Sequence, residues 1–443
     1  MGIAGSFKVA LAGCGTVGGA VAKILVRDRE LIKSRSGVDL ELKYIIDIRF
    51  DHAKELGLDP GLFQTDLETA LKDPEIQCVM ELIGGTTLAR EVIRRCLLAK
   101  KPVVTANKAL LAHHGAELWA LARREGVSLA FEASCGGGIP LIRAFYDGLL
   151  ANRLDAFYGI VNGTCNFILT EMIQNGASYS QALKQAQEEG LAEADPTLDV
   201  SGGDSAHKLT IMAALAFGRK IELEKIPVTG IDALELMDVA FAQELGYVVK
   251  LLAVAQRQSG GLSLRVRPAF ISKAHPLAWI SGAFNAVSIY GHAVGHTMYY
   301  GRGAGGSPTA SAVVADLIQI ALGAYPLLFS QVKVWPDLGE EEVQLGPDQI
   351  TSRFYIRTVM QDTPGMFAQM SAILSKHGIS ISSALQKEPP EDIPGGTGVP
   401  VVVTTHTTQE GLVRRALEEF DKTPGVRQKS VLIDIIDEHP ERI

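Results

Sequence analysis

The sequence contains few cysteines and no spacing that would pair them. There are five in 443 residues, an odd number without a recurring interval, which suggests neither a disulfide framework nor a zinc site and favours a reducing cytoplasm. No apolar run reaches the ~18 residues that a membrane span needs, and no basic segment or cleavage site opens the chain. Gly2 and Ser6 match a myristoylation pattern, but a predicted strand follows at once, so we expect no membrane partner.

Blocks of lysine and arginine are also missing, and the formal net charge is -8. Nucleic acids bind to basic faces, so they are not expected partners. A hydrophobic content of 47% with 21% charged residues is typical of an ordinary globular protein. A chain of 443 residues has room for about two to four domains with buried cores.

Glycine is concentrated where the chain first predicts regular structure. Residues 7–12 form an apolar run typical of a buried parallel strand, and a G-x-G-x-x-G spacing follows before a helical pattern. In this context the glycines predict a dinucleotide site, where backbone N–H groups face a pyrophosphate at a helix start. The alternative is a tight turn without a ligand. The predicted cofactor contacts are Gly13, Gly15, Thr16, Val17 and Gly18.

A second predicted strand ends at Asp47, where a Rossmann unit places the acid that binds the ribose hydroxyls. The interval from the glycines is longer than the usual ~20 residues. Arg49 lies two residues further on and is suited to a 2'-phosphate. Because Asp47 favours NAD and Arg49 favours NADP, the choice between the two cofactors stays open.

Two further predicted strands, over residues 78–85 and 102–105, are followed by Thr86 and Lys108. Ligands of open parallel sheets bind beyond the carboxyl ends of the strands. Topology therefore predicts that Thr86 and Lys108 lie near the nicotinamide. The alternative for Lys108 is a solvated lysine at a helix start.

A glycine-rich turn, SCGGG, follows Glu132 after a fifth predicted strand. Backbone carbonyls together with a carboxylate suit a hard cation. Such a turn can also merely accommodate crowding.

The segment from Ala186 to Lys208 is acidic and ends on a lysine that a following helix would carry into an apolar layer. A partly desolvated lysine beside several carboxylates has a shifted proton affinity, and such groups cluster at reaction sites. We therefore expect Lys208 to lie in the active site.

The whole pattern predicts an α/β protein. Residues 1–150 form a Rossmann-type nucleotide domain, to which a helix over 305–328 returns and places Gly305 near the cofactor. Residues 151–304 predict a catalytic and dimerisation domain with a mostly antiparallel sheet and helices on one side.

A linker rich in proline, glycine and glutamate is predicted over residues 329–351. Residues 352–435 then alternate as β-α-β-β-α-β, which is the ferredoxin-like arrangement, with a loop after Lys387 that we expect to be mobile.

The chain resembles homoserine dehydrogenase with a C-terminal ACT domain over nearly its whole length. The acidic segment has the family's signature spacing in Ala186, Gly190, Leu191, Asp195, Pro196, Asp199, Gly202, Asp204 and Lys208. The resemblance to ACT domains depends on the strand order and on Asp362, Pro364, Gly365, Gly378 and Ile379.

The resemblance implies reduction of L-aspartate 4-semialdehyde to L-homoserine with NADPH or NADH, on the route to threonine, methionine and isoleucine. Lys208 matches the family's proton donor, Asp204 the residue that holds it, and Lys108 a second active-site lysine. Substrate contacts are implied for Glu193, Asp199, Thr164 and Gly163. A monovalent cation site, Na or K, is implied for Glu132, Cys135, Gly137 and Ile139, mostly through carbonyls.

Several alternatives stay open. Asp195 with Pro196 can be turn chemistry, Asp199 a helix N-terminal charge, and His207 a solvent-side helix residue. Cys135 resembles the nucleophile of thioester-forming aldehyde dehydrogenases, although no matching histidine motif is present.

A non-catalytic amino-acid sensor is the other alternative to an enzyme. ACT domains commonly pair and bind an amino acid, so the resemblance implies feedback inhibition, most readily by L-threonine, and a homodimer or homotetramer. The sequence contains no kinase-like region before the glycine loop, as in the family's monofunctional members.

Overall fold

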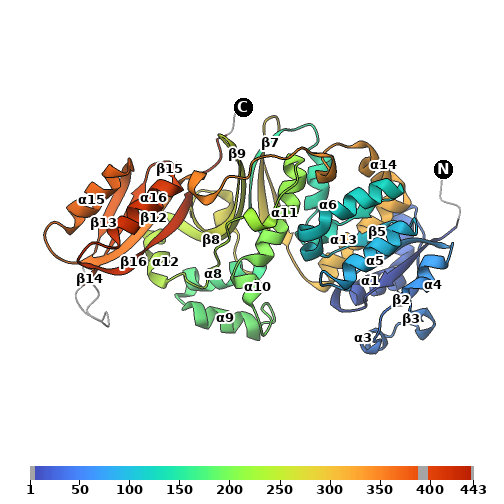
Figure 1. Ribbon diagram of the computed structural model, residues 1–443. Coiled ribbons are helices and arrows are strands. Elements are labelled where there is room, and N and C mark those ends of the chain that lie inside the picture. The colour runs from blue at the N-terminus through green and yellow to red at the C-terminus, as the bar shows by residue number, and fades with distance from the viewer. Residues whose placement is uncertain (1–4, 388–397, 441–443) are drawn as a thin grey trace.

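A computed structural model describes residues 5–387 and 398–440. Gly2 and most of the loop predicted to be mobile lie outside the described residues. Figure 1 shows an elongated molecule, with the N-terminal domain at one end and the C-terminal domain at the other. Within the described ranges no single helix could span a membrane by length and apolarity, and one bent pair, 306–321 with 324–338, meets the criterion.

The N-terminal domain contains a parallel sheet of six strands in the order β3-β2-β1-β4-β5-β6. Strands β1 and β4 are mostly apolar and buried because helices cover both faces of the sheet. The order reverses between β1 and β4, which opens a crevice at their carboxyl ends. The strands are β1 (Phe7–Ala12), β2 (Leu40–Ile46), β3 (Phe63–Gln64), β4 (Ile76–Glu81), β5 (Val103–Thr105) and β6 (Leu129–Ala130). The main helices are α1 (Thr16–Arg27), α2 (Arg29–Ser36), α4 (Leu67–Lys72), α5 (Leu88–Leu98) and α6 (Lys108–Glu125).

A distant part of the chain completes this domain. Helix α13 (Gly306–Ala321) packs against α1, and α14 (Ala324–Gln331) follows it. Trp335, inside the segment predicted to be a linker, is fully buried among Tyr146, Tyr325 and Phe329. That segment therefore contributes to the core.

The middle and C-terminal domains share one sheet of ten strands. Its order is β11-β10-β7-β8-β9-β16-β12-β14-β13, with β15 beside β12. The middle domain contributes β7 (Leu154–Ile160), β8 (Tyr247–Gln258), β9 (Gly261–Ser272), β10 (Phe284–Gly291) and β11 (Gly295–Arg302). Its helices are α8 (Gly163–Asn175), α9 (Tyr179–Glu188), α10 (Thr197–Val200), α11 (Gly203–Phe217) and α12 (Leu236–Glu244).

The C-terminal domain has the predicted β-α-β-β-α-β order, and the α/β fold class is confirmed. Its elements are β12 (Thr351–Gln361), α15 (Met366–Lys376), β13 (Ile381–Gln386), β14 (Gly398–Thr405), β15 (Thr408–Gln409), α16 (Glu410–Phe420) and β16 (Val426–Ile436). The pattern did not predict that β16 pairs in parallel with β9 and joins the two domains into one sheet.

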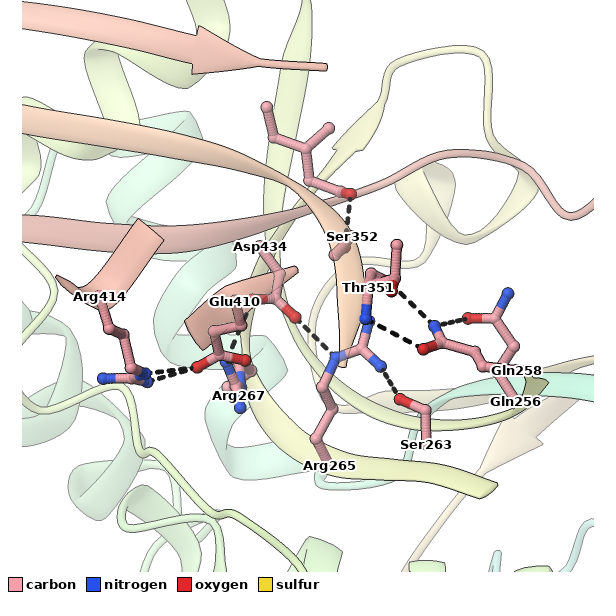
Figure 2. Close-up of polar contacts among 11 residues, drawn as sticks. Gln256, Gln258, Ser263, Arg265, Arg267, Thr351, Ser352, Glu410, Arg414 and Asp434 are labelled. Atoms are coloured by element: carbon pink, nitrogen blue, oxygen red, sulfur yellow. Dashed lines mark hydrogen bonds and ion pairs between the residues drawn. The ribbon is translucent and has the colours of Figure 1, made fainter. Parts of the chain in front are cut away.

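Buried ion pairs reinforce this strand pairing (Figure 2). The Arg265 Nε donates to Asp434 Oδ2 over 2.6 Å, and both side chains are 1% exposed. The Arg267 Nη1 donates to Asp434 Oδ1 over 3.2 Å and to Glu410 Oε2 over 3.0 Å. We call these four residues the ionic junction. Since buried charges are tolerated only when they are paired, the junction requires that β9 and the C-terminal domain stay together.

A second buried group links α12 to β12. The Arg357 guanidinium donates twice to Asp238, over 2.6 and 3.0 Å, and the Tyr355 hydroxyl donates to the same carboxylate over 2.9 Å. Glu235 also lies 3.1 Å from Arg357 but is mostly exposed. The two acids thus offer a matched comparison of a buried and an exposed partner of one arginine.

We predict that Asp238→Asn lowers the free energy of unfolding by about 3–5 kcal/mol, because it removes the buried charge partner of a buried guanidinium and leaves only the mostly exposed Glu235. Glu235→Gln should cost at most about 1 kcal/mol, as for exposed ion pairs. Urea unfolding followed by circular dichroism measures both. Equal effects of the two substitutions would contradict this account.

Candidate active site

Two adjoining cavities occupy the crevice at the carboxyl ends of β1, β4 and β5. One measures about 490 Å³ and is lined by residues that include Gly13, Gly15 and Asp47. The other measures about 300 Å³ and is lined by residues that include Val17 and Lys108. Five of the predicted cofactor residues are therefore distributed over two neighbouring spaces of a size suited to a dinucleotide.

The glycine loop leaves room at the point where a phosphate would approach. Gly13 has a φ of +93°, and a Cβ there would lie 2.7 Å from the Ile83 nitrogen. A Cβ on Gly18 would lie 2.0 Å from the Gly13 oxygen, so this glycine is required for close packing. A Cβ on Gly15 would have no atom within 4 Å. The loop itself thus tolerates a side chain at Gly15, while the adjacent cavity is where the pyrophosphate would lie. Thr16 begins α1.

Backbone N–H groups orient the Asp47 carboxylate. Oδ2 accepts from Cys14 over 2.7 Å, and Oδ1 accepts from Ile48 over 2.7 Å and from Arg49 over 3.2 Å. The Arg49 side chain is exposed and lies 3.5 Å from Asp51. Asp47 is therefore fixed at the cavity wall, whereas the Arg49 side chain points to solvent.

Arg95 lines the larger cavity but was not among the predicted cofactor residues. It comes from α5, and its guanidinium pairs with Glu68. An amphipathic helix pattern identifies the buried side of α5, but it does not reveal which partly exposed cation lies over the cavity.

One carboxylate holds both of the predicted lysines. Asp204 Oδ2 accepts from the Lys208 Nζ over 2.7 Å, and Oδ1 lies 2.9 Å from the Lys108 Nζ. The Lys208 Nζ also donates to the Val161 carbonyl over 2.6 Å. The helix that we expected to follow the acidic segment begins within it, at Gly203. Asp204 and Lys208 therefore stand one turn apart on one helix face.

Charge outweighs burial at Asp204 and Lys108. Burial alone would raise the pKa of Asp204, but the ammonium groups of Lys208 and Lys108 hold it well below its usual range. Burial alone would lower the pKa of Lys108, but the Asp204 carboxylate raises it. Burial raises the pKa of Asp199, and the Asp204 charge acts in the same direction. Asp204 is thus firmly ionised, with a less acidic carboxyl beside it.

Asn162 is a residue of this cluster that sequence reasoning missed. Its Nδ2 donates to Asp199 over 2.7 Å and to Asp204 over 2.9 Å, while its Oδ1 caps α8 by accepting from the Cys165 N–H. The N-G-T turn after a strand was the available signal, because asparagine favours helix N-caps. Asn162 joins the acidic segment to the start of α8.

The predicted substrate residues lie around this cluster but differ in their surroundings. The Thr164 hydroxyl donates to the Leu191 carbonyl over 2.6 Å and so anchors the acidic loop. Gly163 begins α8, where a Cβ would lie 2.9 Å from the Ala283 oxygen. Glu193 is exposed on the same loop. The structure brings Asp199 directly into the cluster and leaves Glu193 at the surface.

Asp195 has the geometry of turn chemistry. Its Oδ1 accepts from the Thr197 N–H over 3.1 Å and from the Thr197 hydroxyl over 2.6 Å. These bonds lower the pKa of the exposed Asp195 carboxyl. They favour the interpretation that this aspartate shapes the loop.

The glycine-rich turn lies under the cluster. Gly136 and Gly137 have φ values of +74° and +57°, and a Cβ on Gly137 would lie 2.7 Å from the Gly303 carbon. The Ile139 carbonyl accepts from the Leu141 N–H over 2.8 Å. In the part of the chain that the structure describes, no group of three or more His, Cys, Asp or Glu side chains gathers as a metal site. A cation here would need the backbone carbonyls.

The Glu132 carboxylate is used within the protein. It accepts from the N–H groups of Ile142 and Arg143 over 3.0 and 2.8 Å. Burial raises the pKa of Glu132 to about 7 and that of neighbouring Asp316 to about 8. Glu132 therefore caps a short helix, and two carboxyls with raised pKa values lie close together beneath the turn.

Cys135 does not have the environment of a nucleophilic cysteine. It is buried, and burial raises the pKa of its thiol to about 12. A reactive cysteine needs a depressed pKa. The environment of Cys135 therefore argues against thioester chemistry.

His207 does not face solvent as the helix pattern suggested. It is half-buried and lines the smaller cavity beside Lys108. Burial, with a contribution from His113, lowers the pKa of His207. The neutral imidazole thus forms part of the cavity wall.

Two other predicted residues lie at the edge of the cavities. Thr86 is half-buried in the turn after β4, beside Gly85, whose carbonyl accepts from the Asn107 side chain over 2.7 Å. Gly305 is the N-cap of α13 with a φ of +118°. A Cβ on the adjacent Gly306 would lie 3.3 Å from the Thr16 oxygen, so this helix start adjoins the glycine loop.

A dinucleotide crevice beside a carboxylate-bound lysine pair defines a nicotinamide-dependent oxidoreductase. The chain matches the family model for the homoserine dehydrogenase NAD binding domain over residues 13–132, that for homoserine dehydrogenase over 140–318, and that for the ACT domain over 354–422. The chain belongs to the homoserine dehydrogenase family.

Relatives resemble the chain over nearly its full length. The homoserine dehydrogenase of Pseudomonas aeruginosa is 42% identical over 97% of this chain and 98% of its own. That of Helicobacter pylori is 42% identical over 95% and 96%. These matches favour a homoserine dehydrogenase over a thioester-forming dehydrogenase and over a non-catalytic sensor.

Solved structures agree with this assignment. A homoserine dehydrogenase from Thiobacillus denitrificans superposes with a TM-score of 0.91 at 40% identity and covers 98% of this chain and 99% of its own. A hyperthermophilic archaeal homoserine dehydrogenase in complex with NADPH has a TM-score of 0.59 at 25% identity, over 72% of this chain and 98% of its own.

We predict that Gly15→Val weakens NADPH binding by at least about tenfold, or ~1.4 kcal/mol, while it leaves the melting temperature unchanged. The added Cβ would have no protein atom within 4 Å, while the valine side chain would occupy the space of the pyrophosphate. Gly18→Ala is the comparison, and it should lower the melting temperature because its Cβ meets the loop backbone. Nucleotide fluorescence titration and thermal melts separate the two effects. Unchanged NADPH affinity in Gly15→Val would refute the placement of the cofactor.

Proposed function

We propose that this chain catalyses the reversible reduction of L-aspartate 4-semialdehyde to L-homoserine and that Lys208 is the proton donor. The observation that carries the proposal is the Asp204 carboxylate bound to both Lys208 and Lys108 beside the nucleotide crevice. On this basis the enzyme supplies intermediates for threonine, methionine and isoleucine.

The cluster is suited to the charge that develops in aldehyde reduction. The bound nicotinamide supplies a hydride to the aldehyde carbon. Negative charge then grows on the carbonyl oxygen and requires a positioned donor. Lys208, which is 7% exposed, is held by Asp204 and the Val161 carbonyl and has one N–H left to donate. Lys108 is more exposed and would orient the same oxygen from the nicotinamide side.

The ammonium of the substrate requires acidic side chains, and its carboxylate requires hydrogen-bond donors. Asp199 and Glu193 would bind the substrate ammonium, and the exposed position of Glu193 requires the acidic loop to close over it. The N-terminus of α8, at Gly163 and Thr164, offers backbone N–H groups to the carboxylate. The Thr164 hydroxyl, which donates to Leu191, would tie this helix start to the closing loop.

The choice between NAD and NADP depends on the residues at the rim of the larger cavity. Asp47 would bind the ribose hydroxyls, and the nearby side chains of Arg49 and Arg95 would pair with a 2'-phosphate. We therefore propose use of both NADP and NAD. A monovalent cation would bind the carbonyls of Cys135, Gly137 and Ile139 and offset the two carboxyls below.

Amino-acid feedback is proposed for the ACT domain, with L-threonine as the effector and a homodimer or homotetramer as the assembly. Effector binding must favour a less active arrangement, since an effector acts only through a difference in affinity. The five cysteines are unpaired and buried, which supports a reducing compartment such as the cytoplasm.

We predict that Lys208→Met lowers kcat for homoserine oxidation by roughly 10²-fold or more, because the developing alkoxide loses its proton partner. The binding of NADPH, followed by fluorescence, should stay within about twofold of the wild type. Lys184→Met, an exposed lysine on α9, is the matched control and should change neither quantity. Near-normal turnover of Lys208→Met would refute this role, and a wild-type protein without homoserine oxidation would refute the function.

We predict that millimolar L-threonine inhibits the wild-type enzyme and that Asp362→Ala raises the half-inhibiting concentration at least about fivefold, as expected for the loss of a typical allosteric coupling. Asp362 lies between β12 and α15, in the loop that carries the ACT resemblance. Glu418→Gln changes an exposed acid of the same domain and should leave inhibition unaltered. Inhibition that is equal in all three proteins would exclude this effector site.

A further inference from the structure

Strand β9 touches the C-terminal domain on one face and the active-site segment on the other. Arg265 and Arg267 project toward Asp434 and Glu410 (Figure 2). Val266 stands between them, and because side chains alternate along a strand, it projects to the opposite face. It is fully buried there. Val266 therefore connects the ionic junction, through its neighbours Arg265 and Arg267, to the residues that pack on the opposite face of β9.

Val266 contacts the turn that begins α11. A Cβ built on Gly202 would lie 3.2 Å from Val266 Cγ1 and 2.9 Å from Val228 Cγ1. Gly202 has a φ of +88° and is the N-cap of α11, two residues before Asp204. This left-handed conformation favours glycine, and the two valines lie too close to accommodate a Cβ without shifting. The position of Asp204 thus depends on where Val266 lies.

The backbone of Val266 also holds the segment that supports this turn. Its N–H donates to the Pro227 carbonyl over 3.0 Å, and its carbonyl accepts from Thr229 over 2.8 Å. Further along the same segment, the Ile231 N–H donates to the Val200 carbonyl over 2.9 Å. Val200 ends α10, which carries Asp199. Val266 therefore supports both acids of the cluster, one by side-chain contact and one through a hydrogen-bonded segment.

The arginines make the register of β9 sensitive to the C-terminal domain. Each pairs with a carboxylate of that domain in a buried setting, where breaking a pair is costly. A displacement of β16 or α16 must therefore move the arginines with it. The exposed Arg414 donates to Glu410 Oε1 over 2.7 Å and extends the junction to the surface of α16.

We propose that Val266 is a positioning residue for the reaction, through which the ionic junction sets the place of Asp204 and thus of the proton donor. The C-terminal domain acts on catalysis through the ionic junction, which positions Val266; Val266 in turn positions Gly202 and thus Asp204. The inference deepens the proposed function, since it names how the regulatory domain reaches the lysine.

The first experiment compares Val266→Ala with Val249→Ala, which removes the same two methyl groups from the same face of neighbouring strand β8. Val266→Ala should lower kcat about tenfold and leave the KM for NADPH within about twofold, because misplacement of a catalytic group by a fraction of an ångström affects chemistry more than binding. The primary deuterium isotope effect on kcat should rise. An equal loss of kcat in Val249→Ala would show that any cavity in this core lowers kcat, and it would overturn the proposal.

Hydrogen exchange tests the same contact without any substrate. Peptides that cover residues 197–208 should exchange about tenfold faster in Val266→Ala than in the wild type and Val249→Ala, because the turn loses its support. Unchanged exchange would refute the proposal. A wild-type protein that oxidises no homoserine would refute the proposed function, while the exchange comparison would still decide the role of Val266.

The second experiment tests the junction with Asp434→Asn and with the milder Arg414→Ala, which alters only the exposed end. Each should lower kcat in the wild type, by about fivefold and about twofold, and have no further effect in Val266→Ala, since coupled sites are non-additive. The Arg414 variant decides the question if Asp434→Asn does not fold. Additive losses, or no loss in Arg414→Ala, would show that the junction does not act through Val266.

Discussion

The active site depends on one carboxylate that is shared by two ammonium groups. Asp204 is buried, and it stays ionised because Lys208 and Lys108 each bind one of its oxygens. Removal of either lysine would leave the other with an excess of buried acid nearby, since Asp199 adjoins the pair. The cluster is therefore a unit whose members hold one another in their charge states, and its geometry also fixes how α8, α11 and the nucleotide crevice meet.

The shared sheet gives this unit a rigid floor. Parallel pairing of β9 with β16 involves only three residue pairs, which is little hydrogen bonding for a domain boundary, and the buried arginines and carboxylates provide the specificity that so short a pairing lacks. Buried ion pairs contribute little net stability but make every alternative register expensive. The pairing of β9 with β16 is therefore specified mainly because any other register would leave buried charges unpaired, and less by the net stability that the ion pairs contribute.

Local patterns were enough to predict the order of strands and helices, the glycine loop, the fold class and the lysine in the acidic segment, because each depends on neighbouring residues. Local patterns could not predict the ten-stranded sheet, because β9 and β16 are more than 150 residues apart and the apolar alternation of each strand does not specify its partner. Asn162 was missed for a related reason: its capping role is local, whereas its bonds to Asp199 and Asp204 span 37 and 42 residues. The exposure of Glu193 and the partial burial of His207 depend on how domains meet, which periodicity does not encode.

The return of α13 to α1 also governs the order in which the chain can fold during synthesis. Helix α1 ends at Arg27, and its partner begins at Gly306. At about 5–20 residues per second a ribosome needs roughly 15–60 s to produce the intervening chain. During that interval the nucleotide sheet lacks one of its covering helices, and the part of α1 that packs against α13 stays uncovered while the middle domain emerges. The domain that comes first in the sequence is thus completed only after most of the second has been made.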